Sequence, residues 1–353
     1  MPGEPLQASR RPRELVLLIL AALLAAGALL PALFAPGPVL TAWLPAAWFL
    51  LGVPTGALVL ALMMRLIPGA WGEELRLSAE AATLLTLPAL VALLPILLAL
   101  AAVYPWAGAG PASLSPFQQA WLAPVPFVAR TLVHGALLLW LGARLRARRS
   151  TRATAAIGVV VLPLTTSALA YDWLLSLDPG FGSSAFGLRQ LALQVTIAFA
   201  AMLLLRLGSG RTPKRPGVLG ALLLTLLLIN VYLMFLPFFI IWSGNLATEV
   251  PWYAARGRGG WAAAVWVFGL TGGLPILPLL FARVRRSARW LRGLSLAVLL
   301  AAAIELGWTV LPGRGTTLLC LVAFAAVTCF LAAALPVALR HRIARRMPSQ
   351  RHT

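Results

Sequence analysis

Few side chains in this sequence are suited to proton transfer, since its 353 residues include nine acidic residues and three histidines. Asp172 follows Tyr171 near the end of one apolar segment, and Glu305 lies near the end of another. Ionisable groups at membrane depth are costly and usually face the interior of a helix bundle. Both carboxylates are therefore candidates for taking up and releasing protons.

Arg130 and His134 lie four residues apart in a further apolar segment. This spacing places two side chains on one face of a helix. A guanidinium group there would anchor a carboxylate or a quinone oxygen, and an imidazole would relay a proton. The alternative is that Arg130 extends to the membrane surface and His134 makes a structural hydrogen bond. The spacing is compatible with both interpretations.

Other polar residues complete two sets of candidates. We expect Glu80 at the cytoplasmic end of the third apolar segment and Glu249 in an outer loop. The candidate proton path comprises Asp172, Glu305, Glu249, His134 and Glu80. Candidate contacts to a quinone, or structural polar contacts, are Arg130, Arg189, Tyr171, Trp173, Asp178, Trp242 and Asn245.

Residue counts argue against metal and haem sites. Cys320 and Cys329 lie nine residues apart in one apolar run, which supports neither a disulfide framework nor a cysteine metal cage. His341 and His352 lie in the basic tail, so the sequence offers no pair of axial histidines for a haem inside the membrane. We expect no directly bound metal or haem, and another subunit would carry any electrons that pass nearby.

The composition excludes a soluble fold. The chain is 61% hydrophobic and 11% charged, with a mean hydropathy of +0.90, whereas an ordinary domain is roughly half apolar and about a quarter charged. A spanning helix needs about 20 mostly apolar residues. This window predicts an all-α integral membrane protein with ten spanning helices, at about 15–34, 40–64, 81–104, 125–143, 153–175, 185–205, 217–242, 261–282, 293–311 and 316–339.

The distribution of basic residues predicts the orientation. Of the 29 Lys and Arg residues, 24 fall on the side of the chain ends, and the other five are Arg130, Arg189, Arg256, Arg258 and Arg314. The positive-inside rule then places both termini in the cytoplasm. The net charge of +20 thus reflects topology and not nucleic-acid binding. We interpret residues 1–353 as one polytopic domain, with basic tails at 1–14 and 340–353 around the core 15–339, and the first apolar run as a retained helix.

Two outer loops have the most distinctive sequences. In residues 171–187, Asp178-Pro179 predicts a turn and Trp173 is expected to anchor at the membrane interface. Residues 241–261 contain Trp242, Asn245 and Glu249 among further aromatic and turn residues.

At these loops the chain resembles the quinone-subunit branch of the polysulfide reductase membrane-subunit family, and most closely the F-type subunits of alternative complex III, a quinol:cytochrome c oxidoreductase. The resemblance runs in order from about Trp43 to Pro312, and its most specific part is Asp-Trp-x-x-Ser-Leu-Asp-Pro at 172–179. Further matching stretches are Trp71-Gly72, Glu80, Tyr104-Pro105-Trp106, Gln119-Ala120-Trp121-Leu122 and Arg130.

The resemblance implies two four-helix bundles beside a homologous quinol-oxidising subunit, beneath periplasmic iron–sulfur and cytochrome c subunits, in a bacterial inner membrane. It implies no haem in the chain itself, with a possible quinone and a part in proton translocation. Gly180 and Phe181 replace a usual His-Trp pair, and Ala247 and Thr248 replace part of a usual Pro-Glu-Glu sequence. The residues that match the family pattern are Asp172, Trp173, Ser176, Asp178, Pro179, Trp242, Asn245, Glu249, Arg130 and Glu305.

Three functions are compatible with the sequence. The first is an integral subunit of a quinol-oxidising respiratory complex that handles quinone or translocates protons. The second is a structural anchor that holds periplasmic electron-transfer subunits and performs no chemistry. The third is a secondary transporter with its substrate site between the two bundles, although matched broken helices, which are typical of such sites, are not evident.

Overall fold

The computed structural model describes residues 10–108, 114–208, 213–314 and 316–344, and this part of the chain contains helices and no strands. Ten of these helical segments are long and apolar enough to cross a membrane, which confirms the prediction of an all-α integral membrane protein. They are α2 (Arg10–Leu29), α3 (Pro36–Leu66), α4 (Ala70–Ala82) continued by α5 (Thr86–Leu98), α8 (Pro124–Arg146), α9 (Arg152–Trp173), α10 (Phe186–Leu207), α11 (Pro216–Ser243), α13 (Gly259–Gly273) continued by α14 (Ile276–Leu279), α16 (Ala288–Val310) and α17 (Thr317–Ala344).

Helices form here because backbone polar groups need internal hydrogen bonds where water is absent. Proline stands in the first turn of several helices, where a missing N–H costs nothing. Thr151 and Ser287 cap α9 and α16, since each side chain accepts a hydrogen bond from a backbone N–H in the first turn. Shorter helices lie in the connections: η1 (Leu30–Leu33), α6 (Leu100–Val103), η3 (Pro105–Ala107), α7 (Pro116–Trp121), η4 (Leu175–Leu177), α12 (Val250–Arg256) and α15 (Ala282–Arg285).

The third span differs from the prediction. It extends over Ala70–Leu98 and not over 81–104. The segment Glu73 to Arg76 reads as a polar loop in the sequence, but it is helical, and Glu74 is buried in an ion pair with Arg206. Glu80 therefore lies about 15 Å into the span, at 1.5 Å per residue, and not at its end.

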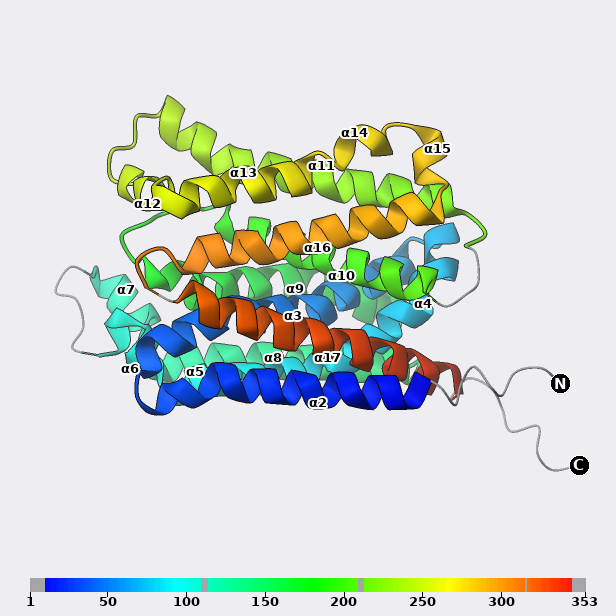
Figure 1. Cartoon of the computed structure of the whole chain (residues 1–353), viewed down its shortest axis with the longest axis horizontal. Helices are drawn as coiled ribbons and strands as arrows, with labels where there is room; N and C mark the ends of the chain where they lie inside the picture. Colours follow the sequence, from blue (N-terminus) through cyan, green and yellow to red (C-terminus); the bar gives the residue numbers. More distant parts are fainter. Residues whose placement is uncertain (1–9, 109–113, 209–212, 315, 345–353) are drawn as a thin grey trace, which may run out of the picture.

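The spans form two four-helix bundles, one from α3, α4/α5, α8 and α9 and the other from α10, α11, α13/α14 and α16. The two central helices, α3 and α10, are the first helix of each bundle, and in their most apolar stretches 94% and 83% of residues are buried. A Cβ atom at Gly56 would lie 2.3 Å from the carbonyl oxygen of Gln194, so this glycine permits the close contact between the bundles. α2 and α17 pack together outside the first bundle (Figure 1).

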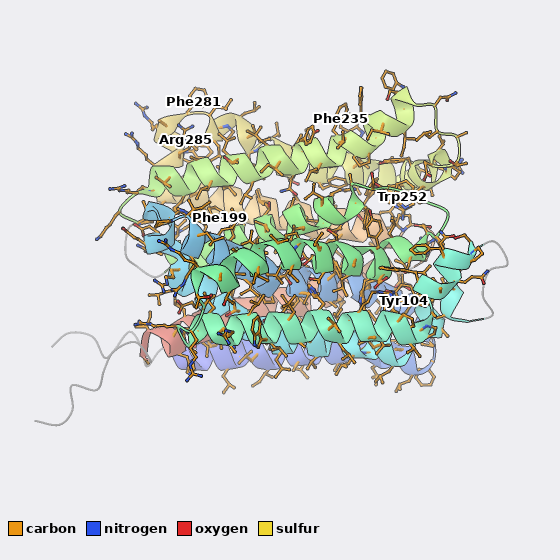
Figure 2. All side chains as sticks on the ribbon, turned by 180° about the vertical axis from the view of Figure 1, so that it is seen from behind. Tyr104, Phe199, Phe235, Trp252, Phe281 and Arg285 are labelled. Atoms are coloured by element: carbon orange, nitrogen blue, oxygen red, sulfur yellow. The ribbon has the colours of Figure 1, made fainter. Side chains whose placement is uncertain are left out.

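Different elements lie at the two ends of the bundles. We call the end at which α2 begins and α17 ends the terminal face, because Glu14 and Arg340 form an ion pair there. We call the opposite end the distal face, where α6, α7 and α12 gather at the left of Figure 1. Figure 2 shows Tyr104 and Trp252 at this distal end and Arg285 at the other.

Candidate functional site

Asp172 and Arg130 form a buried ion pair between α9 and α8 at the distal face. Arg130 donates to both carboxylate oxygens, with Nε–Oδ2 at 2.6 Å and Nη2–Oδ1 at 2.9 Å. Trp121 Nε1 also donates to Oδ1 at 2.9 Å, and the Arg130 guanidinium lies 4.2 Å from the centre of the Trp121 ring. The Asp172 side chain is fully buried, so both of its oxygens are occupied by donors inside the protein.

His134 faces the same neighbouring helix, as its spacing from Arg130 predicts. Its Nδ1 lies 3.0 Å from Thr165 Oγ1 on α9, and the imidazole is buried. Thr165 Oγ1 lies 3.0 Å from the Val161 carbonyl, to which it donates, so Nδ1 carries the proton of the imidazole. Nε2 then accepts no hydrogen bond from the described residues. Arg130 thus pairs with Asp172, and His134 makes a hydrogen bond to Thr165.

Glu305 and Arg189 form the matching ion pair of the second bundle, between α16 and α10. Arg189 Nη2 and Nε lie 2.6 Å and 3.2 Å from Glu305 Oε1. The two side chains are 12% and 6% exposed. Among the described residues Oε2 has no hydrogen-bond partner, in contrast to the saturated carboxylate of Asp172.

Asp178 joins three loops of the distal face. Its Oδ2 accepts from Arg256 Nη2 at 2.9 Å and from Arg314 Nη1 at 3.2 Å, and Arg314 Nη2 donates to Oδ1. Burial alone would raise the pKa of Asp178, but the two guanidinium groups outweigh it and lower that pKa. Burial lowers the pKa of Arg256 to about 10. The predicted turn is present, with Phe181 N donating to the Asp178 carbonyl.

Among the aromatic residues near the first loop, Trp173 differs from its prediction. Trp173 is fully buried and donates to Thr131 Oγ1 at 3.0 Å, so the prediction of an interfacial anchor was wrong. The backbone carbonyl of Trp173 accepts a hydrogen bond from Tyr104 Oη at 2.9 Å. Burial raises the pKa of Tyr104. Tyr171 Oη lies 2.8 Å from the carbonyl of Ser183, on the loop that follows α9.

The second predicted loop motif does not converge on one site. Glu249 accepts from the backbone N–H of Gly182 at 2.8 Å and so ties this loop to the first one. Trp242 is 70% exposed, and Asn245, with φ of 47°, forms a left-handed turn. Neither side chain joins the ion pairs described above.

Glu80 lies toward the terminal face, away from the other candidate acids. Arg342 of α17 donates to its Oε2 at 2.6 Å, and Arg76 lies 3.4 Å from its Oε1. The Glu80 side chain is fully buried. It therefore links α17 to the first bundle. Within the described residues, no group of three or more His, Cys, Asp or Glu side chains is placed to hold a metal ion.

Two cavities open at the distal face. The smaller, of about 300 Å³, lies between α7 and the end of α9. The larger, of about 510 Å³, lies between the loops that contain Asp178, Arg256 and Arg314. The smaller cavity is lined by Phe117, Gln118, Trp121, Leu122, Tyr171, Leu175, Ser176, Pro179 and Phe181.

Five buried polar side chains on α3, α10 and α16 lack hydrogen-bond partners among the described residues. Gln190 and Gln194 on α10 are buried, and neither end of either amide has a hydrogen-bond partner among the described residues. Gln194 packs against Gly52 of α3. Trp48 Nε1 and Thr55 Oγ1 of α3 and Ser295 Oγ of α16 are buried and equally unpartnered within the described chain. We call these five residues the central polar group.

Sequence reasoning missed several residues of these networks. Trp121 was noted as part of a matching stretch and not as a partner of Asp172, and the two glutamines were not noted. Arg256 and Arg314 were counted among the five basic residues on the outer side, and that unusual position was the signal that could have identified them. A scan of protein-family models finds no match to this chain, and a search of curated proteins finds no similar sequence.

Proposed function

We propose that the chain is an integral membrane subunit of a quinol-oxidising respiratory complex and that it conducts protons between the distal face and the membrane centre. In this proposal the membrane is a bacterial inner membrane, the distal face is periplasmic and both termini are cytoplasmic. A homologous ten-helix subunit and periplasmic iron–sulfur and cytochrome c subunits would be its partners. The sequence resemblance and the positive-inside distribution support this assignment.

The central polar group is the observation that carries the proposal of proton conduction. A buried amide without a hydrogen bond costs about 1–3 kcal/mol, so four unpartnered amide atoms on Gln190 and Gln194 are a large cost for a purely structural helix contact. Polar groups kept within spanning helices commonly line ion or proton pathways. Internal water bound to these amides would satisfy them and would provide a hydrogen-bonded chain for protons.

Glu305 is the acidic residue that we assign to this proton path. Its partner Arg189 precedes Gln190 on α10, so the ion pair lies at the distal end of the central polar group. Ser295 precedes Glu305 by ten residues on α16 and therefore lies about 15 Å closer to the terminal face. Glu305 Oε2 is unoccupied by donors of the described chain and is available to take a proton, while Arg189 holds Oε1 in place.

The proposal is tested by removing the amides. We expect Gln190→Leu and Gln194→Leu in the purified complex to lower the number of protons moved per electron while leaving assembly intact. Gln119→Leu is the control, because Gln119 is an exposed distal-face residue outside the central polar group. The measurement is the proton/electron ratio in liposomes, with mass spectrometry and a visible spectrum of co-purifying c-type haem.

The other two functions are outcomes of the same experiment. An unchanged ratio in both glutamine variants, in an assembly that contains c-type haem, would contradict proton conduction and support the anchor. A single colourless polypeptide that takes up solute in liposomes would contradict the respiratory assignment and support a transporter.

A quinone site is a second function, favoured by the smaller distal cavity. Its volume of about 300 Å³ is at the lower end of ligand pockets. Aromatic side chains line it, which suits a flat ring, and a quinol bound there would supply electrons and protons. Two lining residues contact Asp172: Trp121 donates to its carboxylate, and Ser176 donates to its carbonyl.

Photolabelling tests the quinone site. An azidoquinone should label residues 116–122 and 171–181, and excess unlabelled quinone should suppress the labelling. Phe117→Leu keeps an apolar wall and should retain labelling, whereas Ser176→Trp should fill the cavity and abolish it. Labelling that does not change in Ser176→Trp would place the quinone elsewhere.

A further inference from the structure

Most residues that line the larger distal cavity do not line the smaller one, and the two linings differ in chemical character. Three loops enclose it, at 177–181, 248–256 and 312–314, and its volume is about 510 Å³. Arg256 and Arg314 lie on its wall together with one carboxylate, that of Asp178. Its other wall residues are uncharged, so the lining carries one positive charge in excess.

The guanidinium groups retain unused donors. Each guanidinium has five N–H groups. Among the described residues Arg256 makes three hydrogen bonds, to Trp252 O, Asp178 Oδ2 and Thr309 O, and its Nε is buried with no acceptor there. Arg314 also makes three, of which two go to Asp178 and one to Leu177 O. One N–H group of Arg256, on Nη1, and two of Arg314, on Nε and Nη1, therefore remain for another acceptor, whereas Arg256 Nε is buried.

Two further charged groups near the cavity are engaged outside its lining. Arg189 pairs with Glu305, and the carboxylate of Glu249 binds the backbone N–H of Gly182 outside the lining. Burial of Arg256 lowers its pKa to about 10, which reflects incomplete compensation by Asp178. A further anion at the wall would complete that compensation.

We propose that the larger distal cavity binds a small organic monocarboxylate, whose carboxylate lies against Arg256 and Arg314 and whose apolar body lies against Phe181 and Pro312. A guanidinium pair favours planar carboxylates, because its N–H groups match both oxygens. Trp252 stiffens this wall, since its ring stacks on Phe181 at 4.4 Å and lies 3.8 Å from the Arg256 guanidinium. The proline and aromatic rings of the lining supply the apolar contact.

Benzoate and its neutral analogue benzamide are the probes. We expect benzoate to bind the purified full-length chain in nanodiscs with saturation by calorimetry, and benzamide to bind at least tenfold more weakly. Thr248 is an exposed residue of the lining that takes part in no ion pair among the described residues. Thr248→Glu introduces a competing carboxylate and should weaken benzoate binding at least tenfold, whereas Thr248→Gln should leave it within twofold.

Two single arginine variants give an independent measurement. Arg314→Gln should weaken benzoate binding at least tenfold, whereas Arg258→Gln, which removes an equal charge from the same face outside the lining, should not. Absence of saturable benzoate binding to the wild-type chain, or equal binding by Thr248→Glu and Thr248→Gln, would overturn the proposal.

A comparison of the isolated chain with the native complex distinguishes two sources of the carboxylate, a free ligand and an acidic side chain of a partner subunit. A free carboxylate ligand predicts that benzoate binds the isolated chain and the native complex alike. An acidic side chain of a partner subunit predicts binding to the isolated chain and at least tenfold weaker binding to the complex. Neither measurement depends on proton conduction, so this proposal and the proposed function fail separately.

Discussion

The two buried ion pairs of the distal face differ in how completely their carboxylates are occupied. Asp172 and Glu305 lie near the distal ends of α9 and α16, the last helices of the two bundles, and each pairs with an arginine. Asp172 receives three donors on two oxygens and has no exposed side-chain surface. Glu305 receives two donors on one oxygen and is 12% exposed.

This difference separates positioning from proton transfer. A carboxylate whose oxygens are all occupied holds its neighbours in place, and it takes up a proton only by breaking those bonds. A carboxylate with one free oxygen can take up a proton on that oxygen while the donors on the other oxygen stay in place. We therefore expect Asp172 to position α7, α8 and α9 and, under the proposed function, Glu305 to accept and release protons.

The largest predicted effect is that of Arg130→Met. It leaves a fully buried carboxylate without its cation, which costs about 3–5 kcal/mol of unfolding free energy. Arg189→Met should cost less, because Glu305 retains some exposure to solvent. The measurement is unfolding of the purified variants in detergent.

The double variant Arg130→Met, Asp172→Leu is the control for that comparison. Replacing both members of a buried pair by apolar residues is often close to neutral, so it should recover most of the stability. Equal losses in Arg130→Met and Arg189→Met would contradict the contrast between the two pairs.

A large functional effect is expected from Glu305→Gln. The amide keeps the shape of the side chain and cannot take up a proton, so under the proposed function the proton/electron ratio should fall while quinol oxidation continues. Asp172→Asn should leave the ratio unchanged in whatever fraction assembles. If only Asp172→Asn lowered the proton/electron ratio, proton transfer would be assigned to Asp172 and not to Glu305.

Asp178→Asn provides a test by pH, because two arginines lower the pKa of Asp178. The ionised carboxylate stabilises the folded chain above its unfolded pKa of about 3.9, and this contribution is lost as pH falls through the lower, folded pKa. The variant should lose about 2 kcal/mol at pH 7. The difference in thermal unfolding between the two proteins should begin to shrink below about pH 4 and should vanish only below the folded pKa of Asp178. A difference that persists in acid would assign the loss to packing.

The smallest predicted effect is that of Trp121→Phe, which removes one of the three donors to Asp172. We expect a loss of about 1–2 kcal/mol, typical of a hydrogen bond to a charged group. Trp242→Phe is the control, because that ring is exposed and should change stability by less than about 0.5 kcal/mol. Equal effects would show that the indole N–H of Trp121 does not hold the pair.

Local sequence patterns predicted the elements and not their contacts. The apolar windows predicted all ten spans, and the spacing of Arg130 and His134 predicted that both face one neighbour, which is α9. The third span was misplaced because Glu73 to Arg76 looks like a loop until Glu74 meets Arg206, 132 positions away. Trp173 was misplaced because an indole suits both an interface and a core.

The sequence by itself determined the number of spans and the small set of ionisable residues, because hydropathy over about 20 residues is a local property. Only the tertiary structure decided which arginine each acid meets, since Arg189 and Glu305 are 116 positions apart and Arg314 and Asp178 are 136 apart. A charged group in an apolar interior must find an opposite charge, and helix packing determines which one lies within reach. The same packing left Gln190 and Gln194 unpartnered within the described chain and arranged two guanidinium groups around one carboxylate at the distal face.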